Sequence, residues 1–294
     1  MPELPEVQAL ADVIDEQFRG QWISRAELGS LSALKTYDPP LADLADATLV
    51  GTGRRGKFLV LHLVDAQGVP LDLVVHLSRA GWIHWRTSDR LAPLRPGKGP
   101  VALRLTWRDE AGAATVLDVT EAGTQKRLAI HLVHELTQVP GITRLGPEAL
   151  SLSPDDLAAL LAGAGKRQLK TLLRDQSVLA GIGNAYSDEI LHAAKLSPYA
   201  AADSLAPAQV AALHAAMQQV LRDATLRTTS AGIGKMKAEK RAGLRVHDRT
   251  GQPCDVCGTP IAQVRLADSS FQYCPKCQTG GKVLADRGMS RLLK

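Results

Sequence analysis

Four cysteines near the end of the chain have the spacing of a metal site. Cys254 and Cys257 form one Cys-x2-Cys pair, and after sixteen intervening residues Cys274 and Cys277 form a second. Two such pairs supply the four thiolates of a tetrahedral zinc site, which this spacing favours over a redox pair or unligated thiols. Four protein ligands leave no open coordination position, so we predict one structural Zn²⁺ and not a catalytic metal.

Two other stretches have residues that can bind a phosphate. Gly181 and Gly183 precede an expected helix over 184–196, and glycines let a phosphate approach the N–H groups of a helix N-terminus. Asn184 can cap that helix or add a donor, and an ordinary turn between helices has the same composition. Lys57 begins an apolar strand after two arginines, where it can hold a phosphate, move a proton or lie in a solvated basic turn.

The N-terminus reads MPELPEV and concentrates two prolines and two carboxylates in five residues. Pro2 and Pro5 favour the first turn of a helix, and Glu3 and Glu6 favour its positive end. Taken alone, the stretch is explained by this structural role.

The elements that must position these residues fall into two patterns. Val7, Leu10, Ile14 and Phe18 recur at helical spacing after the N-terminal stretch. Short β-type runs separated by turns then favour an antiparallel sandwich or barrel. The runs cover residues 57–64, 71–77, 82–85, 101–107 and 115–120.

The second half of the chain is helical before the cysteines. The Pro- and Gly-rich stretch 140–150 is typical of a linker. Ser153 and Pro154 have the residue types of an N-cap and a first helical position. Helical periodicity covers 153–162, 166–175, 184–196 and about 206–227, whereas the polar, Gly- and Lys-rich stretch 230–251 predicts a loop. The segment 264–273, between the cysteine pairs, is compatible with a β-hairpin.

Composition limits the class of protein. The chain has 294 residues, 45% of them hydrophobic, a net charge of +5 and a pI near 9.1, a mild bias toward a polyanionic partner. No apolar run approaches the ~18 residues of a membrane span. Acidic residues stand where a secretion signal has basic ones, so we expect a cytoplasmic protein. In a reducing compartment, clustered cysteines favour a metal site over disulfides.

Taken in order, these motifs resemble the formamidopyrimidine-DNA glycosylase and endonuclease VIII family of base-excision enzymes. The stretches PELPEV, GKFL, RLGPEAL, LLRDQSVLAGIGNAYSDEIL, QPCDVCGTPI and YCPKCQ carry the resemblance along the whole chain. It implies an α+β multidomain protein: a β-sandwich catalytic domain with a flanking helix (1–135), a linker (136–152), a helix–two-turn–helix domain (153–245) and a zinc finger (246–294). PELPEV is similar to the formamidopyrimidine branch.

The resemblance gives the N-terminal stretch a chemical role. It implies that Met1 is removed and that Pro2, as a secondary amine, attacks C1′ of a damaged nucleotide flipped out of the duplex. Glu3 is then the acid/base and Glu6 a carboxylate that orders the site, while Lys57 contacts a phosphate and assists β-elimination. The DNA-binding candidates are Lys57, Arg79, Lys98, Gly183, Asn184 and Arg265.

Three positions depart from the family pattern. The family's HLGMSG reads HLSRAG here, with Arg79 at the methionine that fills the void left by the flipped base. The family's inserting loop DPRRFG is represented by Asp118 to Gly123. Ser269 falls where the zinc-finger arginine stands, and Arg265 lies on the same expected hairpin. We expect Arg79 to replace part of the void filler, since a guanidinium stacks on bases.

These residues predict a monomeric bacterial glycosylase and abasic-site lyase that acts on damaged double-stranded DNA at the nucleoid. A protein that only binds or only cleaves abasic DNA is the alternative, because altered reading loops are also expected where base excision is lost. A zinc-ribbon protein with an unrelated N-terminus is a third possibility. Oxidised purines, oxidised pyrimidines and abasic sites all remain candidate lesions.

Overall fold

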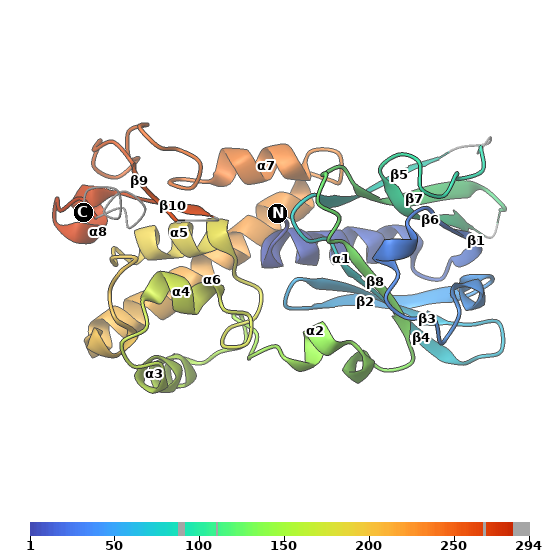
Figure 1. Cartoon of the computed structure of the whole chain (residues 1–294), viewed down its shortest axis with the longest axis horizontal. Helices are drawn as coiled ribbons and strands as arrows, with labels where there is room; N and C mark the ends of the chain where they lie inside the picture. Colours follow the sequence, from blue (N-terminus) through green and yellow to red (C-terminus); the bar gives the residue numbers. More distant parts are fainter. Residues whose placement is uncertain (88–91, 110, 267–268, 285–294) are drawn as a thin grey trace. The chain divides into compact units, whose positions relative to one another are not determined.

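The computed structural model describes residues 1–87, 92–109, 111–266 and 269–284. The chain forms two compact units (Figure 1). Unit 1 consists of Met1–Arg144 and Thr225–Lys237, and unit 2 consists of Leu145–Ala224 and Ala238–Lys294. None of the helices in the described residues combines the length and hydropathy that a bilayer span needs.

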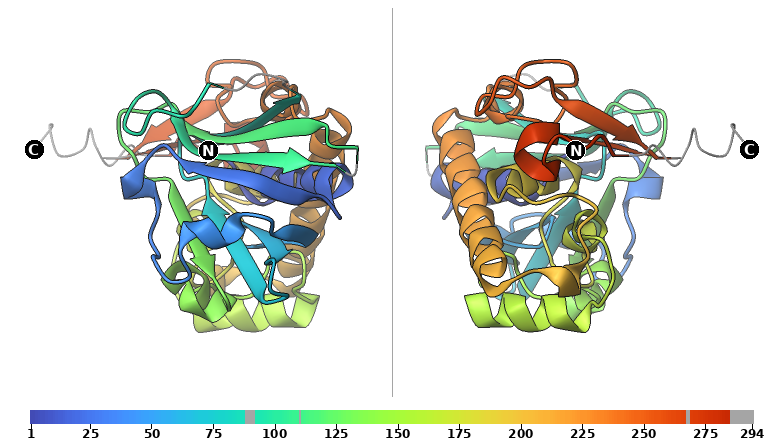
Figure 2. Two further views of the ribbon diagram at one scale, coloured as in Figure 1. Left: turned by 90° about the vertical axis from the view of Figure 1, so that its right-hand side faces the viewer. Right: turned by 90° about the vertical axis from the view of Figure 1, so that its left-hand side faces the viewer.

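Unit 1 is built on one eight-stranded antiparallel sheet. The strand order is β5-β7-β6-β1-β2-β3-β4-β8, and β1 joins β2 through a single residue pair, Trp22 with Thr48. The sheet therefore separates there into two four-stranded layers (Figure 2). The strands are β1 (Trp22–Leu28), β2 (Thr48–Arg55), β3 (Phe58–Val64), β4 (Pro70–His76), β5 (Gly81–Thr87), β6 (Val101–Arg108), β7 (Ala114–Glu121) and β8 (Ala129–Val133).

The two layers and the helix α1 (Leu4–Phe18) enclose one apolar core. Leu61 and Leu73 enter it from one layer, Leu105 and Trp107 from the other, and Ile14 from α1. The expected antiparallel sandwich with a flanking helix is therefore confirmed. Strands β1, β2 and β8 were not expected as separate strands, because glycines, arginines or short length mask their alternation.

The helices after residue 153 follow the expected periodicity. They are α3 (Pro154–Gly163), α4 (Leu169–Arg174), α5 (Asn184–Ala193) and α6 (Pro207–Ser230), of which α6 contributes residues to both units. The short helix α2 (Pro140–Thr143), in unit 1, was not expected and lies in the stretch 140–150 that resembled a linker. Single 3₁₀ turns cover Leu31–Ala33, Leu41–Leu44, Leu136–Gln138 and Ala202–Ser204.

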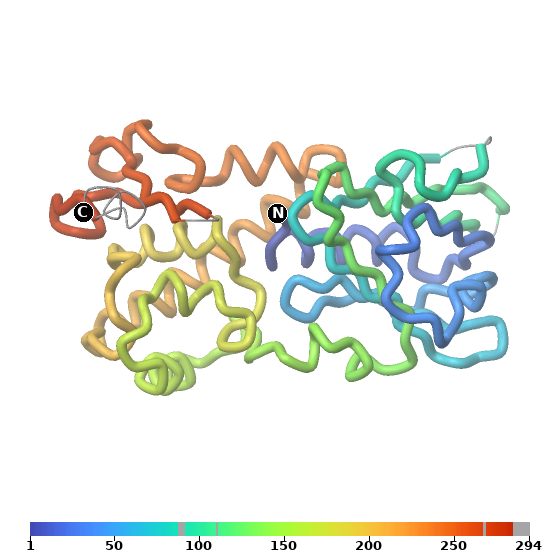
Figure 3. The backbone as a smooth tube through the Cα atoms, viewed as in Figure 1, coloured from blue at the N-terminus to red at the C-terminus, as the bar shows by residue number. Residues whose placement is uncertain are grey.

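The prediction of a loop over 230–251 is wrong in its centre. Residues Met236–Gly243 form helix α7, visible as a coil in the orange part of the trace (Figure 3). Lys, Ala, Glu and Arg in this stretch are strong helix formers. Met236 is fully buried in the core of unit 1 and begins the helix.

The cysteine region forms the expected hairpin followed by a short helix. Strands β9 (Ala262–Arg265) and β10 (Ser270–Tyr273) pair antiparallel, and α8 (Pro275–Thr279) begins directly after Cys274. Cys254 and Cys257 lie in the turn before β9. The chain order of helices, hairpin and cysteines agrees with the expected fold class.

Candidate active site and zinc site

Pro2, Glu3 and Glu6 lie at the first turn of α1. Glu3 is the N-cap residue, and Glu6 Oε2 accepts a hydrogen bond of 2.8 Å from the Glu3 backbone N–H. Glu3 is 2% and Glu6 0% exposed, and Pro2 is also buried. The positive end of the helix stabilises negative charge here. Glu3 therefore follows Pro2 directly at the start of the helix, and the carboxylate of Glu6 fixes the backbone of Glu3.

Lys57 occupies a tight turn between β2 and β3, one residue before the strand in which the sequence placed it. Arg55 pairs with Phe58 across the turn, and Gly56 has a φ of 55°, as glycine at the first position of a two-residue hairpin turn does. Lys57 is only 8% exposed. A buried ammonium group at a fixed turn is suited to binding an anion.

His76, which is not among the residues expected from the sequence motifs, lies beside Lys57. The ring of Phe58 packs on the His76 ring with centroids 4.6 Å apart. Burial, the charge of Lys57 and the charge of His131 together lower the pKa of His76 to about 4. The imidazole is therefore neutral at neutral pH and supplies one donor and one acceptor next to the lysine. A histidine at the end of the apolar run 71–77 was the available signal.

Arg79 lies in the turn between β4 and β5, and its side chain is exposed. Gly81 closes this turn, because a Cβ there would come within 2.1 Å of the Leu77 carbonyl oxygen. The Ala122 N–H donates to the Ala80 carbonyl, so the turn lies against the segment that follows β7.

The residues matched to the family's inserting loop are mostly strand. Asp118 to Glu121 belong to β7, and Asp118 accepts hydrogen bonds from Arg104 at 2.6 Å and Arg86 at 3.0 Å. Burial opposes ionisation of Asp118, but the two arginines outweigh it and lower its pKa. The loop itself begins at Ala122, and Glu121 fixes its end by accepting the N–H groups of residues 127 and 128.

Lys98 lies on an exposed turn between β5 and β6. Its N–H donates to the Arg95 carbonyl, and Gly97 and Gly99 on either side adopt left-handed φ angles of 75° and 82°. Within unit 1 it is the solvated counterpart of Lys57.

The glycine loop is held by a residue that sequence analysis overlooked. Gln176 donates through Nε2 to the Ile182 carbonyl at 2.7 Å, and its Oε1 accepts the Gly181 N–H at 3.0 Å. Gly181 has a φ of 102°, which an L side chain strains. The proposed cap was wrong: Gly183 is the N-cap, and Asn184 is the first residue of α5.

Asn184 instead joins the glycine loop to the cysteine hairpin. Its Nδ2 donates to the Ser270 carbonyl at 2.7 Å, at the start of β10. Ser270 is the register partner of Arg265, the last residue of β9. Arg265 is exposed, and Ser269, beside the undescribed residues 267–268, accepts the Leu266 N–H through its backbone carbonyl at 2.8 Å. Asn184 and Arg265, 81 positions apart in sequence, are therefore both connected to Ser270.

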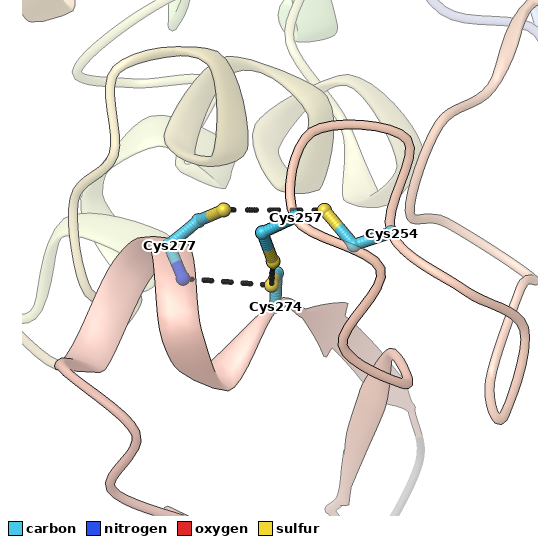
Figure 4. A group of neighbouring side chains, drawn as sticks. All are labelled: Cys254, Cys257, Cys274 and Cys277. Carbon is cyan, nitrogen blue, oxygen red and sulfur yellow. Dashed lines mark hydrogen bonds between the residues drawn. The ribbon is translucent and has the colours of Figure 1, made fainter.

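The four cysteine sulfurs gather at one point (Figure 4), all within 4.8 Å of one another. Cys257 and Cys274 are 3.4 Å apart and Cys254 and Cys277 3.9 Å apart, close to the ~3.8 Å edge of a Zn–S₄ tetrahedron with 2.3 Å bonds. A hydrogen bond from Thr259 lowers the pKa of Cys257 to about 6, while burial raises that of Cys274. Four such sulfurs fit one structural Zn²⁺, which supplies the cation that lets all four ionise.

A buried charge network fixes the hairpin to α4 and α5. Lys170 Nζ donates to Asp188 Oδ1 at 2.6 Å and to Ser187 at 2.7 Å, and Asp188 Oδ2 contacts His247 Nδ1 at 2.6 Å. The Gln272 N–H also donates to Asp188. Lys170 and Asp188 are 3% and 0% exposed, so removing either charge leaves the other buried and under-compensated.

Comparison with known proteins places this arrangement in a family. Residues 1–125 match the formamidopyrimidine-DNA glycosylase N-terminal domain, and residues 145–235 match the H2TH domain of the same enzymes. Residues 251–280 match a zinc finger found in FPG and IleRS.

Individual relatives match between half and nearly all of the chain. Formamidopyrimidine-DNA glycosylase of Symbiobacterium thermophilum is 35% identical over 289 residues, covering 95% of this chain and 89% of that protein. An uncharacterized formamidopyrimidine-DNA glycosylase-like protein of Mycobacterium tuberculosis is 63% identical over 150 residues, covering 51% of this chain and 94% of its own. Lactococcus lactis Fpg in complex with abasic-site DNA superposes with a TM-score of 0.78 at 24% identity, covering 94% and 99% of the two chains.

The architecture is thus that of a two-unit protein with a β-sandwich, a helical H2TH region and a four-cysteine zinc finger. The chain belongs to the formamidopyrimidine-DNA glycosylase family.

Proposed function

We propose that the mature protein is a DNA glycosylase and abasic-site lyase of base excision repair whose nucleophile is the amine of Pro2. The observation that carries the proposal is the buried first turn of α1, where Glu3 stands beside Pro2 and Glu6 holds the Glu3 backbone. In the chain that begins with Met1 the Pro2 nitrogen is an amide, so removal of Met1 is part of the proposal.

The chemistry follows from an amine beside a carboxyl group. The neutral Pro2 amine attacks C1′ of the damaged nucleotide, the C1′–N bond to the base breaks, and the base leaves with the bonding electrons and a proton. Glu3 protonates the sugar ring oxygen as the ring opens to an iminium ion. Loss of a C2′ proton then breaks the C3′–O bond, and water hydrolyses the iminium to free the enzyme.

Phosphate contacts are assigned to residues on both units. Lys57, with the neutral His76 beside it, is suited to a phosphate near the reacting sugar, and Lys98 to a more solvated one. The N-terminus of α5, with Gly183 and Asn184, attracts a phosphate through its backbone N–H groups. Arg265 is proposed to take the place of the zinc-finger arginine, since its register partner Ser270 is hydrogen-bonded to Asn184.

A flipped nucleotide leaves a void in the duplex that a side chain must fill. Arg79 is proposed for part of this task, because it projects into solvent from a turn closed by Gly81. An Arg79→Ala protein is expected to lose rate on duplex lesions and to keep its rate on single-stranded abasic DNA. Equal rates for variant and wild type on duplex DNA would remove this role.

Borohydride trapping on abasic DNA tests the reaction. The mature protein should form a reducible covalent adduct at Pro2, identified by peptide mass, and Pro2→Gly should trap much less. A protein that only binds abasic DNA traps nothing, which would favour the non-catalytic alternative. Material that retains Met1, as measured by intact mass, and still cuts lesion-bearing strands would end the proposal.

The place of action is proposed to be the bacterial cytoplasm, at the nucleoid during repair. The named relatives are bacterial proteins of this family, and the net charge of +5 favours a polyanionic partner. The partner is proposed to be damaged double-stranded DNA, bound by one copy of the chain; the similar Lactococcus lactis Fpg forms a complex with DNA that contains an abasic site.

A further inference from the structure

One face of α5 carries three buried side chains that each contact the cysteine region. Glu189 accepts the backbone N–H groups of Arg245, Val246 and His247 at 2.8 to 3.0 Å. Asp188 binds His247 and the Gln272 N–H. The third side chain, His192, lies one turn further along and is 4% exposed.

The contact of His192 differs from the other two because it reaches a metal ligand. Its Nε2 lies 3.3 Å from the sulfur of Cys254, which is itself 3% exposed. A zinc-bound thiolate has no proton to give, so a hydrogen bond across this distance requires the proton to be on Nε2.

An N–H donor beside a four-thiolate zinc site compensates part of the negative charge of the site. Zn²⁺ with four thiolates carries a net charge of −2, and in a buried site that charge needs compensation. A donor to one sulfur withdraws electron density from it and makes its protonation, the first step of ligand loss, less favourable. Hydrogen bonds to metal ligands of this kind are typically worth about 10–100-fold in metal affinity.

We propose that His192 donates an Nε2–H hydrogen bond to the Cys254 thiolate and thereby slows the loss of zinc. The helix that begins at the glycine loop with Asn184 thus also holds the metal site, so zinc and the phosphate-binding end of α5 depend on the same element. His192 is a positioning residue in this role and not a zinc ligand, because the four sulfurs already complete the tetrahedron.

The test uses the full-length, zinc-loaded protein and needs no DNA, so its outcome is independent of catalysis by Pro2. Zinc transfer to a chromophoric chelator is followed at pH 7 for wild type, His192→Phe and His192→Gln. We expect release from His192→Phe to be at least about 10-fold faster, within the 10–100-fold range above. His192→Gln retains an N–H donor and should recover part of the loss.

His214→Phe is the matched control. His214 also lies on a helix of unit 2, but its Nε2 contacts the Leu152 carbonyl at 2.8 Å and not a cysteine. Its loss should leave zinc release unchanged. Equal release rates for wild type and His192→Phe, both folded by circular dichroism, would overturn the proposal, as would acceleration by the control to the same degree.

Cobalt substitution distinguishes a donor from a ligand. The Co²⁺ protein should show the absorption of four thiolate ligands, and His192→Phe should keep the same ligand-field bands. A three-thiolate, one-imidazole spectrum in wild type that changes in the variant would make His192 a ligand and refute the proposal.

A measurement on wild type covers the case in which His192→Phe fails to fold. In the ¹¹³Cd-substituted protein, the Nε2 proton of His192 should be coupled to the metal through the Cys254 sulfur. A ring protonated only at Nδ1, seen in its ¹⁵N shifts, would exclude the hydrogen bond.

Discussion

The first turns of α1 and α3 follow the same local rules and differ in where they lie. Both helices have a proline in the first two positions and a capping box between the N-cap and the third helical residue, Glu3 with Glu6 and Ser153 with Asp156. Ser153, Pro154 and Asp156 are exposed, whereas Glu3 and Glu6 are 2% and 0% exposed. Local sequence therefore forms the cap in both cases, and tertiary packing decides which carboxylates are kept away from water.

A second pair of sites in unit 1 repeats the contrast. Lys57 and Lys98 each follow a glycine in a basic turn, but Lys57 is 8% exposed and lies beside His76, while Lys98 is exposed. A buried cation or carboxylate interacts more strongly with its surroundings than a solvated one. The buried member of each pair should therefore govern activity, and the exposed member should have only a local effect.

The largest difference is expected between Glu3→Gln and Ser153→Ala. Removing a general acid/base typically costs about 10²–10⁴-fold in rate, and Glu3→Gln should lower base excision within that range. Ser153→Ala removes an N-cap that is worth about 1 kcal/mol of stability and should leave the rate unchanged. Single-turnover excision on a duplex with one lesion, together with urea unfolding, measures both effects.

An excision rate for Glu3→Gln within a factor of two of wild type would contradict the catalytic assignment. It would make the α1 turn a structural cap like that of α3.

The second largest effect should be a loss of folding stability of unit 1 at acid pH, which depends on His76. Its pKa is about 4 in the folded chain and ~6.5 when unfolded, so the folded state binds fewer protons between these values. The contribution of the neutral His76 to the free energy of unfolding is fully present above pH 6.5. It is lost as the pH falls toward 4, and amounts to roughly 3 kcal/mol for a shift of this size. His76→Phe, which keeps a ring against Phe58, should flatten the dependence of urea midpoints on pH in this window.

His134→Gln is the control for this titration, because His134 is exposed and its ring contacts only a carbonyl oxygen, that of Pro70, among the described hydrogen bonds. Its midpoints should follow wild type at each pH. If His76→Phe loses as much stability as wild type between pH 7.5 and 4.5, the neutral His76 is not the source of the sensitivity.

The carboxyl group at the third helical residue should stabilise the protein more in the capping box of α1 than in that of α3. Glu6→Ala leaves the buried Glu3 N–H without its acceptor, which typically costs about 1–3 kcal/mol. Asp156→Ala exposes the equivalent N–H of Ser153 to water, so its unfolding midpoint should shift less. Calorimetry of both variants shows which one loses more stability. A larger loss of stability for Asp156→Ala than for Glu6→Ala would contradict this interpretation.

These contrasts show which parts of the fold and site can be predicted from sequence. Cys254 and Cys257, like Cys274 and Cys277, meet within single turns, so spacing alone predicted the metal site, and Ser153 marked its helix in the same local way. Gln176 and His76 act through neighbours that the fold brings close; nothing in the sequence marks Gln176, and His76 is marked only by its place in the apolar run 71–77. His192 contacts Cys254 across 62 positions, which no local pattern encodes.

Two stretches were harder to predict, for different reasons. The glycines and lysines of 230–251 predicted a loop, but the strong helix formers of Met236–Gly243 form α7, whose first residue is buried in unit 1. Asn184 had the residue type of a cap but binds Ser270, because the hairpin supplies a carbonyl next to it. For Asn184, a partner distant in sequence determined the outcome.

The smallest effects should separate the two lysine turns by the salt dependence of DNA binding. A lysine that contacts a phosphate releases a counterion, and its loss lowers the slope of log affinity against log salt by about one. Lys57→Ala should show this change and a slower reaction, because its turn holds the ammonium group in one place beside His76. Lys98→Ala should lower the slope by less, since a solvated side chain exchanges a phosphate for water at little cost, and its reaction rate should equal that of wild type.

Fluorescence anisotropy with abasic duplex at several salt concentrations gives the slopes. Equal slopes and equal rates for the two variants would mean that burial at Lys57 stabilises the hairpin and does not serve the DNA.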